Sequence, residues 1–284
     1  MAKILSGKEV TAALKARQQA AVAELEQLGV APTLAIVRVG EREDDIAYER
    51  GATKRCEGVK VEVKRFVLDV DASQEELVST IEKINADDSI HGVLLFRPLP
   101  KHMDENLICN TLAPEKDIDG ITRGSLASVF AGTKSGFAPC TAAACIEILD
   151  FYGYDPKGKK ATVIGRSLVV GKPVAMMLLD KHATVTICHT RTADMPAAAR
   201  DADILIVAAG RAKVIGREYF RAGQIVIDVG INVDENGNMC GDTDFEQAAE
   251  IVEAITPVPG GVGTVTTSIL VDNVITAARR SLKN

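Results

Sequence analysis

The feature that most constrains the fold of this chain is the alternation of helix-like and strand-like segments from end to end. In the first half, these segments are a helix at 6–28, a strand at 33–39, a helix at 44–57, a strand at 59–68, a helix from 73, and a strand at 92–96. Strands that are separated by helices pair in parallel and carry helices on both faces of the sheet. The pattern therefore predicts an α/β fold with a parallel sheet.

A second α/β series follows a helix that is expected at about 141–152. Its strand-like runs are 161–164, 183–187, 203–207 and 224–228. A last helix, expected at about 266–282, returns to the first lobe. We therefore expect two α/β lobes, the second Rossmann-like, with a ligand-binding cleft between them. The predicted domains are 1–142 with 266–284, and 143–265.

Composition excludes several classes of function. The 284 residues carry a net charge of −6, with basic and acidic residues interspersed, so nothing predicts nucleic-acid binding. No apolar run is long enough to span a membrane, and the N-terminal residues do not resemble a signal peptide. The six cysteines form no C-x-x-C pair and the four histidines are scattered, so no metal site is expected. Free thiols favour a cytoplasmic protein.

A glycine-containing turn follows the strand at 161–164 and opens a helix. Gly165 allows close approach of the backbone, and the helix N-terminus offers free N–H groups to a phosphate. The spacing is not G-x-G-x-x-G, because Ser167 takes the place of the middle glycine. Arg166 and Arg191 follow strands and could pair with a ribose 2'-phosphate. The alternative is a plain turn between strand and helix, with two ordinary surface arginines.

Segment 257–264 holds three glycines and two prolines, a composition that predicts irregular structure. Such a loop before a helix can lay its backbone against a flat ligand, or it can simply connect the lobes. Segment 114–120 places Asp117 and Asp119 on either side of an isoleucine. A carboxylate there could accept paired N–H donors from a planar heterocycle, although a solvated acidic turn is the alternative. Tyr48 could stack on an aromatic ligand; on sequence alone, packing in the core is favoured.

Together, these segments resemble the methylenetetrahydrofolate dehydrogenase/cyclohydrolase family, and the similarity extends over nearly the whole chain. The motifs that carry it, in order, are 40–48, 92–95 with 97–100, 114–120, 139–141, 165–173, 228–232 and 257–263. The resemblance implies an oxidoreductase of one-carbon metabolism, in a pathway that serves purine biosynthesis. Such an enzyme oxidises methylenetetrahydrofolate with a nicotinamide cofactor, and bifunctional members then hydrolyse the methenyl product. It also implies a folate-binding catalytic domain, an NAD(P)-binding domain and a homodimer formed through the nucleotide lobe.

The resemblance also implies roles for particular residues. Tyr48 and Asp119 are the expected catalytic residues, with Tyr48 stacking on the folate and Asp119 reading the pterin edge. The expected substrate-binding residues are Tyr48, Ala52, Leu95, Phe96, Arg97, Asp119, Pro259, Gly260, Gly261, Val262 and Gly263. The expected cofactor-binding residues are Gly165, Arg166, Ser167, Thr190, Arg191 and Ile231. The two arginines favour NADP over NAD, which the sequence leaves open.

The chain departs from the family pattern at three positions. Ala52 stands where the family has a catalytic lysine, and Phe96 where it has the glutamine expected to bond that lysine. Thr264 replaces a proline, with no role that we can assign. Lys54 is a poor substitute, because two residues along a helix turn a side chain by about 200°.

These departures separate the two activities. Hydride loss from the methylene carbon removes no proton, so position and orientation supply most of the catalysis. Hydrolysis needs an acid/base group, which typically contributes about 10²–10⁴-fold. We therefore expect dehydrogenase activity with weak or absent cyclohydrolase activity, and a separate cyclohydrolase in the same pathway.

Two alternatives stay open. One is a bifunctional enzyme in which Lys54, Arg50 or Arg97 supplies the missing chemistry. The other is a catalytically idle folate- or nucleotide-binding subunit of a larger complex, which intact cofactor and pterin motifs argue against. The direction of flux and the preference for polyglutamate chains do not follow from the sequence.

Overall fold

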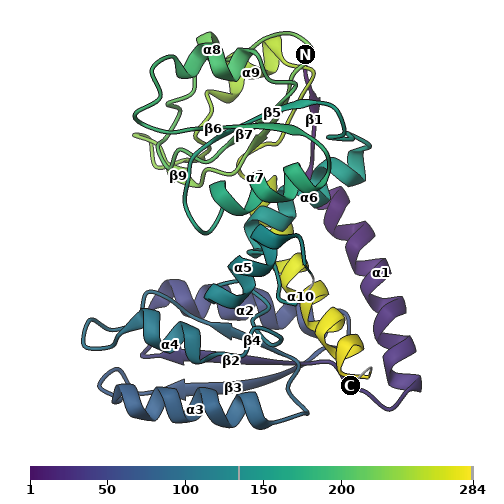
Figure 1. The fold of residues 1–284 in the computed structure, drawn as a ribbon, viewed down its shortest axis with the longest axis vertical. Coiled ribbons are helices and arrows are strands. Elements are labelled where there is room, and N and C mark those ends of the chain that lie inside the picture. The colour runs from purple at the N-terminus through teal and green to yellow at the C-terminus, as the bar shows by residue number, and fades with distance from the viewer. Residues whose placement is uncertain (134, 283–284) are drawn as a thin grey trace. The chain divides into compact units, whose positions relative to one another are not determined.

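The computed structural model describes residues 1–133 and 135–282 and confirms the predicted α/β class (Figure 1). The chain divides into two compact units, each with its own parallel sheet. The six-stranded unit comprises Met1–Ala12 and Thr141–Thr266, and the three-stranded unit comprises Ala13–Cys140 and the chain from Thr267 onward. The first twelve residues thus group with the second sheet, whereas the sequence alone suggested the first lobe. Strand β1 (Lys3–Ile4) explains the difference, because it pairs in parallel with β11 (Ala254–Ile255).

The three-stranded unit contains a parallel sheet in the order β3–β2–β4. Its elements, with two helices that it shares with the other unit, are α1 (Gly7–Gln27), β2 (Thr33–Val39), α2 (Glu43–Glu57), β3 (Glu62–Leu68), α3 (Gln74–Ala86), β4 (Gly92–Leu95), α4 (Glu105–Thr111), α5 (Arg123–Ala131) and α10 (Val262–Ser281). Strand β2 is central, with Val37 opposite Phe66 of β3 and Leu95 of β4. Its apolar, largely β-branched sequence suits a strand that is covered on both faces.

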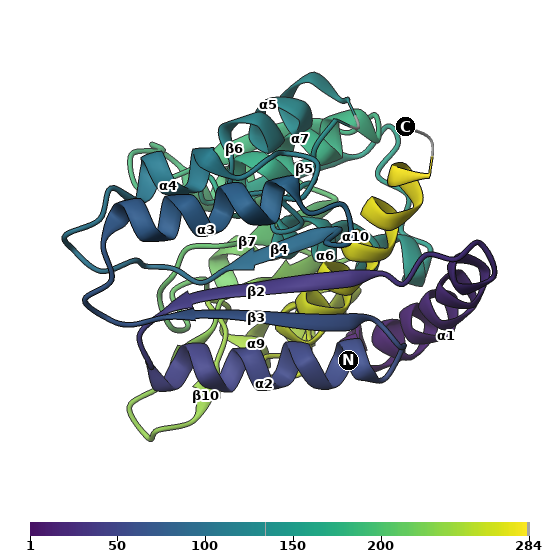
Figure 2. The same cartoon turned by 90° about the horizontal axis from the view of Figure 1, so that it is seen from below.

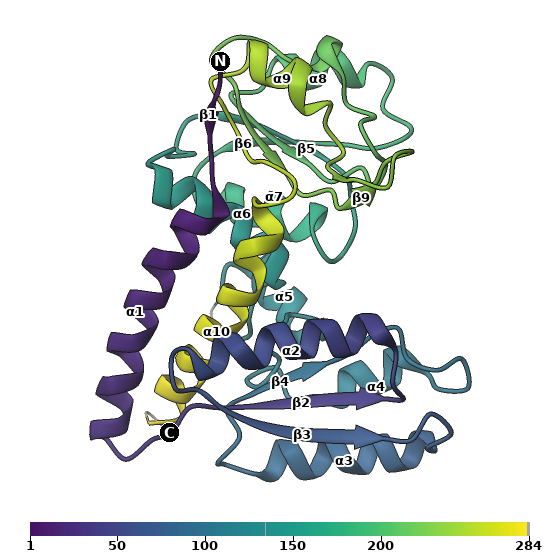
Figure 3. The ribbon, with the colours of Figure 1, turned by 180° about the vertical axis from the view of Figure 1, so that it is seen from behind.

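Helices α2 and α3 lie on opposite faces of this sheet (Figures 2 and 3). Because side chains alternate along a strand, Val37 and Leu95 share one face and pack in a buried cluster with Leu77 and Ile81 of α3. Helix α3 begins after Ser73, whose hydroxyl accepts the N–H of Glu76 at 3.1 Å, and serine is a favoured residue at this position. The opposite face of the sheet is the one that α2 covers, and it carries the candidate site.

The six-stranded unit contains a parallel sheet in the order β1–β11–β8–β7–β5–β6 and a separate antiparallel hairpin, β9–β10. Its remaining elements are α6 (Cys140–Tyr152), β5 (Lys160–Ile164), α7 (Gly171–Asp180), β6 (Thr184–Cys188), α8 (Met195–Arg200), β7 (Ile204–Val207), the 3-10 helix η1 (Arg217–Tyr219), β8 (Ile225–Asp228), β9 (Asn232–Val233), β10 (Met239–Cys240) and α9 (Phe245–Ile251). The four long strands agree with the predicted runs to within one residue at each end. Strand β5 lies between β6 and β7, so the chain leaves it on one side and returns on the other. Ligands of open α/β sheets bind at the carboxyl end of such a strand.

All six cysteines belong to the described residues, where they are buried and form no disulfide. Within 1–133 and 135–282, no helix is long and apolar enough to cross a lipid bilayer.

His91 generates a prediction about stability. It precedes β4, is 8% exposed, and its Nδ1 accepts the N–H of Thr33 at 3.2 Å. Desolvation, followed by the charge of Lys116, holds the pKa of His91 below its ordinary value. A histidine with a lowered native pKa binds protons more readily in the unfolded chain, so it lowers stability as pH falls below its unfolded pKa. Between pH 7.5 and 5.5, the free energy of unfolding in urea should therefore fall more in the native protein than in His91→Gln.

The comparison of the two proteins matters, because Asp119 and Asp228, whose pKa values desolvation raises to about 6, titrate in the same pH range with the opposite effect on stability. His102→Gln is the matched control, because His102 is exposed and contacts the backbone carbonyl of Ala72 through Nε2. Identical pH slopes for the native protein and His91→Gln would contradict this prediction.

Candidate functional site

In the three-stranded unit, two aromatic rings mark the site face of the sheet. Tyr48 on α2 meets Phe96, which follows β4, edge to face, with ring centroids 5.8 Å apart and planes at 83°. Phe96 is buried, whereas 37% of Tyr48 stays exposed. Tyr48 therefore packs on one edge and still offers part of its ring to a ligand.

The two acids of segment 114–120 have different surroundings. Asp117 is fully buried, and its carboxylate accepts the N–H groups of Ile121 at 3.0 Å and Thr122 at 2.8 Å. It holds the turn, so it is neither a ligand group nor part of a solvated acidic turn. Asp119 is half-buried, and loss of solvent, assisted by the charge of Asp117, raises its pKa to about 6. A carboxyl group with this pKa is ionised at neutral pH and titrates just below it.

Asp119, Tyr48 and Cys140 form a cluster in the same unit. Desolvation first, then the charges of Asp119 and Cys140, raise the pKa of Tyr48 well above its ordinary value, against a smaller effect of a hydrogen bond with Thr267. The Cys140 thiol donates to the carbonyl of Ile118 at 3.2 Å, and its pKa is raised by burial. Asn273, which donates its side-chain amide to the same carbonyl at 2.8 Å, was not found from sequence. The last helix carries many other polar residues, so its sequence gives no signal that singles out Asn273.

Three further expected folate residues of this unit, Ala52, Leu95 and Arg97, differ in their surroundings. Ala52 is fully buried on α2, while Lys54, two residues on, is exposed. Leu95 points into the core cluster on the α3 face, away from the aromatic pair, so that only its backbone adjoins Phe96. Arg97 is half-buried and lies 3.9 Å from Glu105, Nη1 to Oε1. No amine therefore occupies the α2 position where the family resemblance implies one.

In the six-stranded unit, the turn after β5 leaves no room for side chains at two glycines. A Cβ on Gly165, whose φ is +131°, would lie 2.3 Å from the carbonyl oxygen of Ala208. A Cβ on Gly171, where α7 begins, would lie 2.2 Å from that of Gly165. Ser167 accepts the N–H of Val170 at 3.1 Å, and no side chain caps α7. A narrow turn with free N–H groups suits a phosphate.

The residues expected to contact the ribose and its phosphate come shortly after two neighbouring strands, β5 and β6. Gly165 N–H donates to the carbonyl of Cys188 at 2.9 Å, which joins the carboxyl ends of β5 and β6. Arg166 follows β5, and Thr190 and Arg191 follow β6; all three are exposed. Both arginines thus belong to the same edge of the sheet.

A pocket of about 240 Å³ lies at the carboxyl end of β8. It is lined by Asp228, Val229, Gly230, Ile231, Met239, and the run from Pro257 to Thr264, which includes Pro259, Gly260, Gly261, Val262 and Gly263. The prediction that 257–264 is entirely irregular is wrong, because α10 begins at Val262. Glycine is less costly in the first turn than in the middle of a helix, and eighteen further helical residues follow Gly263.

Two buried carboxylates organise the loops around this pocket. Asp228 accepts the N–H groups of Gly230, Asp242 and Thr243 at 2.9, 3.1 and 2.8 Å. Asp242 accepts those of Gly210 at 2.8 Å and Arg211 at 2.9 Å. Despite its three donors, loss of solvent raises the pKa of Asp228 to about 6.

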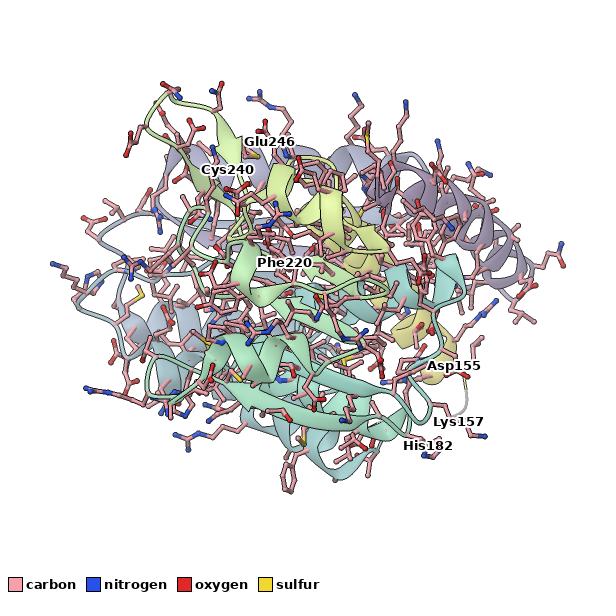
Figure 4. All side chains as sticks on the ribbon, turned by 90° about the horizontal axis from the view of Figure 1, so that it is seen from above. Asp155, Lys157, His182, Phe220, Cys240 and Glu246 are labelled. Atoms are coloured by element: carbon pink, nitrogen blue, oxygen red, sulfur yellow. The ribbon has the colours of Figure 1, made fainter. Side chains whose placement is uncertain are left out.

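A second pocket of about 310 Å³ also includes Asp228, together with residues of β10 and α9. Cys240 and Glu246 mark this side of the unit in Figure 4. Asp228 therefore contributes to the walls of both pockets.

Comparison with known families agrees with this geometry. Residues 139–282 match the NAD(P)-binding domain of tetrahydrofolate dehydrogenase/cyclohydrolase, and residues 5–119 match the catalytic domain of the same family.

Named relatives give the same result. The chain is 48% identical over 281 residues to the bifunctional protein FolD of Clostridium botulinum, covering 99% of this chain and 100% of the relative. The crystal structure of bifunctional FolD from Campylobacter jejuni is 37% identical, covers 99% of each chain and superposes with a TM-score of 0.95. The Trypanosoma brucei FolD structure, solved with NADP and an inhibitor, is 32% identical, covers 100% of this chain and 99% of its own, and has a TM-score of 0.91.

Sequence identity and fold thus agree over almost the entire length, and both family models match in the expected order. The chain belongs to the tetrahydrofolate dehydrogenase/cyclohydrolase family.

Proposed function

We propose that this protein oxidises 5,10-methylenetetrahydrofolate to 5,10-methenyltetrahydrofolate with NADP. The observation that carries the proposal is the cluster of a partly exposed tyrosine ring, Tyr48, and the desolvated carboxyl of Asp119. An aromatic ring and an ionised acceptor suit a flat heterocycle with N–H donors on its edge. The family assignment supports the same substrate class.

In this proposal, Tyr48 stacks on the folate and Asp119 accepts hydrogen bonds from the pterin. Ala52, Phe96, Arg97 and the backbone of Leu95 complete the folate surface. The run from Pro259 to Gly263 lies along the folate or the nicotinamide, next to Ile231. Because hydride transfer needs no general base, these residues act by holding the methylene carbon in position.

The turn after β5 fits a dinucleotide, because neither Gly165 nor Gly171 has space for a side chain. Gly165, Arg166 and Ser167 would hold its phosphates, with Thr190 and Arg191 at the adenosine ribose. NADP, when bound, accepts the hydride. The relative from Trypanosoma brucei was solved with NADP. Two exposed arginines at one sheet edge favour the 2'-phosphate form for this chain as well.

The second activity rests on two different observations. The relatives are named bifunctional, which supports hydrolysis of the methenyl product better than its loss. Ala52 and Phe96 alone support a weak hydrolase, because neither side chain can accept or donate a proton. We therefore propose a bifunctional enzyme in which Ala52 and Phe96 determine how fast the methenyl product is hydrolysed.

Restoring the amine tests this reading of Ala52. Ala52→Lys combined with Phe96→Gln should raise hydrolysis of methenyltetrahydrofolate, by up to about 10²–10⁴-fold, the usual contribution of a positioned acid/base group. The decay of methenyl absorbance without cofactor measures it. In Lys54→Ala, the rate should stay that of the native protein, because Lys54 is exposed on another side of α2. Fast native hydrolysis that disappears in Lys54→Ala would show that Lys54 replaces the family lysine.

Cofactor choice is tested at the two arginines. Arg166→Ala with Arg191→Ala should raise KM for NADP by at least roughly 10-fold, since even one charged hydrogen bond contributes about 1.5–3 kcal/mol. KM for NAD should change less than threefold. Equal losses with both cofactors would refute the 2'-phosphate contact, and Arg217→Ala, which removes an exposed arginine of η1, is the control.

The raised pKa of Asp119 predicts a pH profile. Since this carboxyl protonates at about 6, kcat/KM for the folate substrate should fall as pH drops through that value. In Asp119→Asn, the limb near pH 6 should be absent and kcat/KM at pH 7.5 should be lower by roughly 10- to 100-fold, from the loss of a charged acceptor. An unchanged acidic limb in the variant would assign that pKa to another group.

A further inference from the structure

Helix α2 carries Tyr48, yet little apolar surface attaches it to the sheet. Its buried residues are Asp45, Glu49, Ala52 and Cys56. Two of these are acidic and the other two are small. A helix on a sheet is usually held by a stripe of large apolar side chains, which this set does not supply. Another interaction must therefore fix how α2 is rotated about its axis.

Glu49 supplies that interaction with two arginines, and we call these three residues the Glu49 ion cluster. One carboxylate oxygen accepts Nε of Arg38 on β2 at 2.9 Å, and the other accepts Nε of Arg65 on β3 at 2.7 Å. Only 12% of the Glu49 side chain and 12% of the Arg38 side chain are exposed. Charge-assisted bonds to both oxygens, in a site with little water, fix the carboxylate in position and direction.

Both arginines are held in turn. Arg38 donates Nη1 to the carbonyl of Gly40 at the end of β2. Arg65 donates Nη2 to the hydroxyl of Thr53 on α2 at 3.1 Å, a second tie between helix and sheet. The Glu49 ion cluster thus connects α2 to two neighbouring strands at once.

Because Glu49 and Tyr48 are adjacent on α2, the position of one determines the position of the other. Tyr48 is the residue before Glu49, about 100° away around the helix, and Ala52 projects between them. A rotation of α2 that moved Glu49 would carry the Tyr48 ring along, away from Phe96. Since the ring contact is at 5.8 Å, the ring position depends on the rotation that the ion cluster sets.

We propose that Glu49 is a positioning residue, which holds the Tyr48 ring in place for the folate through its bonds with Arg38 and Arg65. The proposal rests on the proposed function in one respect, namely that Tyr48 contacts the folate. The cluster and its effect on the ring are independent of it.

The test compares Glu49→Gln with Glu57→Gln, which removes an exposed acid from the last position of the same helix. In Glu49→Gln, kcat/KM for methylenetetrahydrofolate should fall between about 10- and 100-fold, the cost of a small misplacement. KM for NADP should stay within twofold. Glu57→Gln should match the native protein in both.

A second readout needs no activity. The chain has four tyrosines, so ¹³C-tyrosine NMR gives four ring signals, and Tyr48→Phe identifies the one from Tyr48. That signal should shift in Glu49→Gln and stay in place in Glu57→Gln. The other three tyrosines belong to the six-stranded unit and serve as internal references.

Arg65→Gln covers the case in which Glu49→Gln does not fold, because the Arg65 side chain is 47% exposed. It should move the Tyr48 signal in the same direction by less. In the double variant Glu49→Gln with Arg65→Gln, kcat/KM should be no lower than in Glu49→Gln alone, as expected for partners in one cluster. An unmoved Tyr48 signal in Glu49→Gln and Arg65→Gln would overturn the proposal. If the native protein does not oxidise the folate, the proposed function fails, while the NMR comparison still decides the role of Glu49.

Discussion

Buried carboxylates that accept backbone N–H groups are the interaction on which the candidate sites of both units depend. Asp117, Asp228 and Asp242 are each 3% exposed or less. Burial of a charge is costly unless hydrogen bonds replace the lost water, and here loops supply the donors. Asp117 fixes the turn that carries Asp119, and the other two connect the loops around Ile231. Irregular backbone thereby gains a defined geometry from hydrogen bonds within the chain, which is what binding groups need.

The strands could be predicted because a covered parallel strand leaves a continuous apolar run. Thr33–Val39 was predicted with its observed bounds, and β5 to β8 nearly so. The short strands β1 and β11 were missed, since two residues carry no periodicity and the partners lie about 250 positions apart in the sequence. The same limit applies to the β9–β10 hairpin. Grouping of the first twelve residues with the six-stranded unit follows from that missed pairing.

Site residues could be predicted from sequence where the local backbone conformation requires a particular residue type. They could not be predicted where the role of a residue depends on a partner that is distant in the sequence. Gly165 was identified from its place after a strand, and the structure gives the reason in its contact with Ala208. Asp117 and Asp119 could not be told apart, because the N–H groups that occupy Asp117 come from a turn whose shape no motif describes. Glu49 was overlooked for the same reason, since its partners come from two different strands.

Charged side chains are unevenly distributed around α2, as Ala52, Phe96 and the Glu49 ion cluster show. Arg38 and Arg65 are paired with Glu49 to one side of α2, while the surface beside Tyr48 has a methyl group and an aromatic ring. Asp119 supplies a carboxylate near Tyr48, with Cys140 and the charge of Arg97 close by. The proposed hydride transfer leaves a cation on the folate. A like charge about 4 Å from it would cost about 4 kcal/mol at an effective dielectric constant near 20, whereas a carboxylate at that distance would stabilise it. Alanine at position 52 avoids that cost in the proposed oxidation, and in our proposal the same substitution sets a lower rate of hydrolysis.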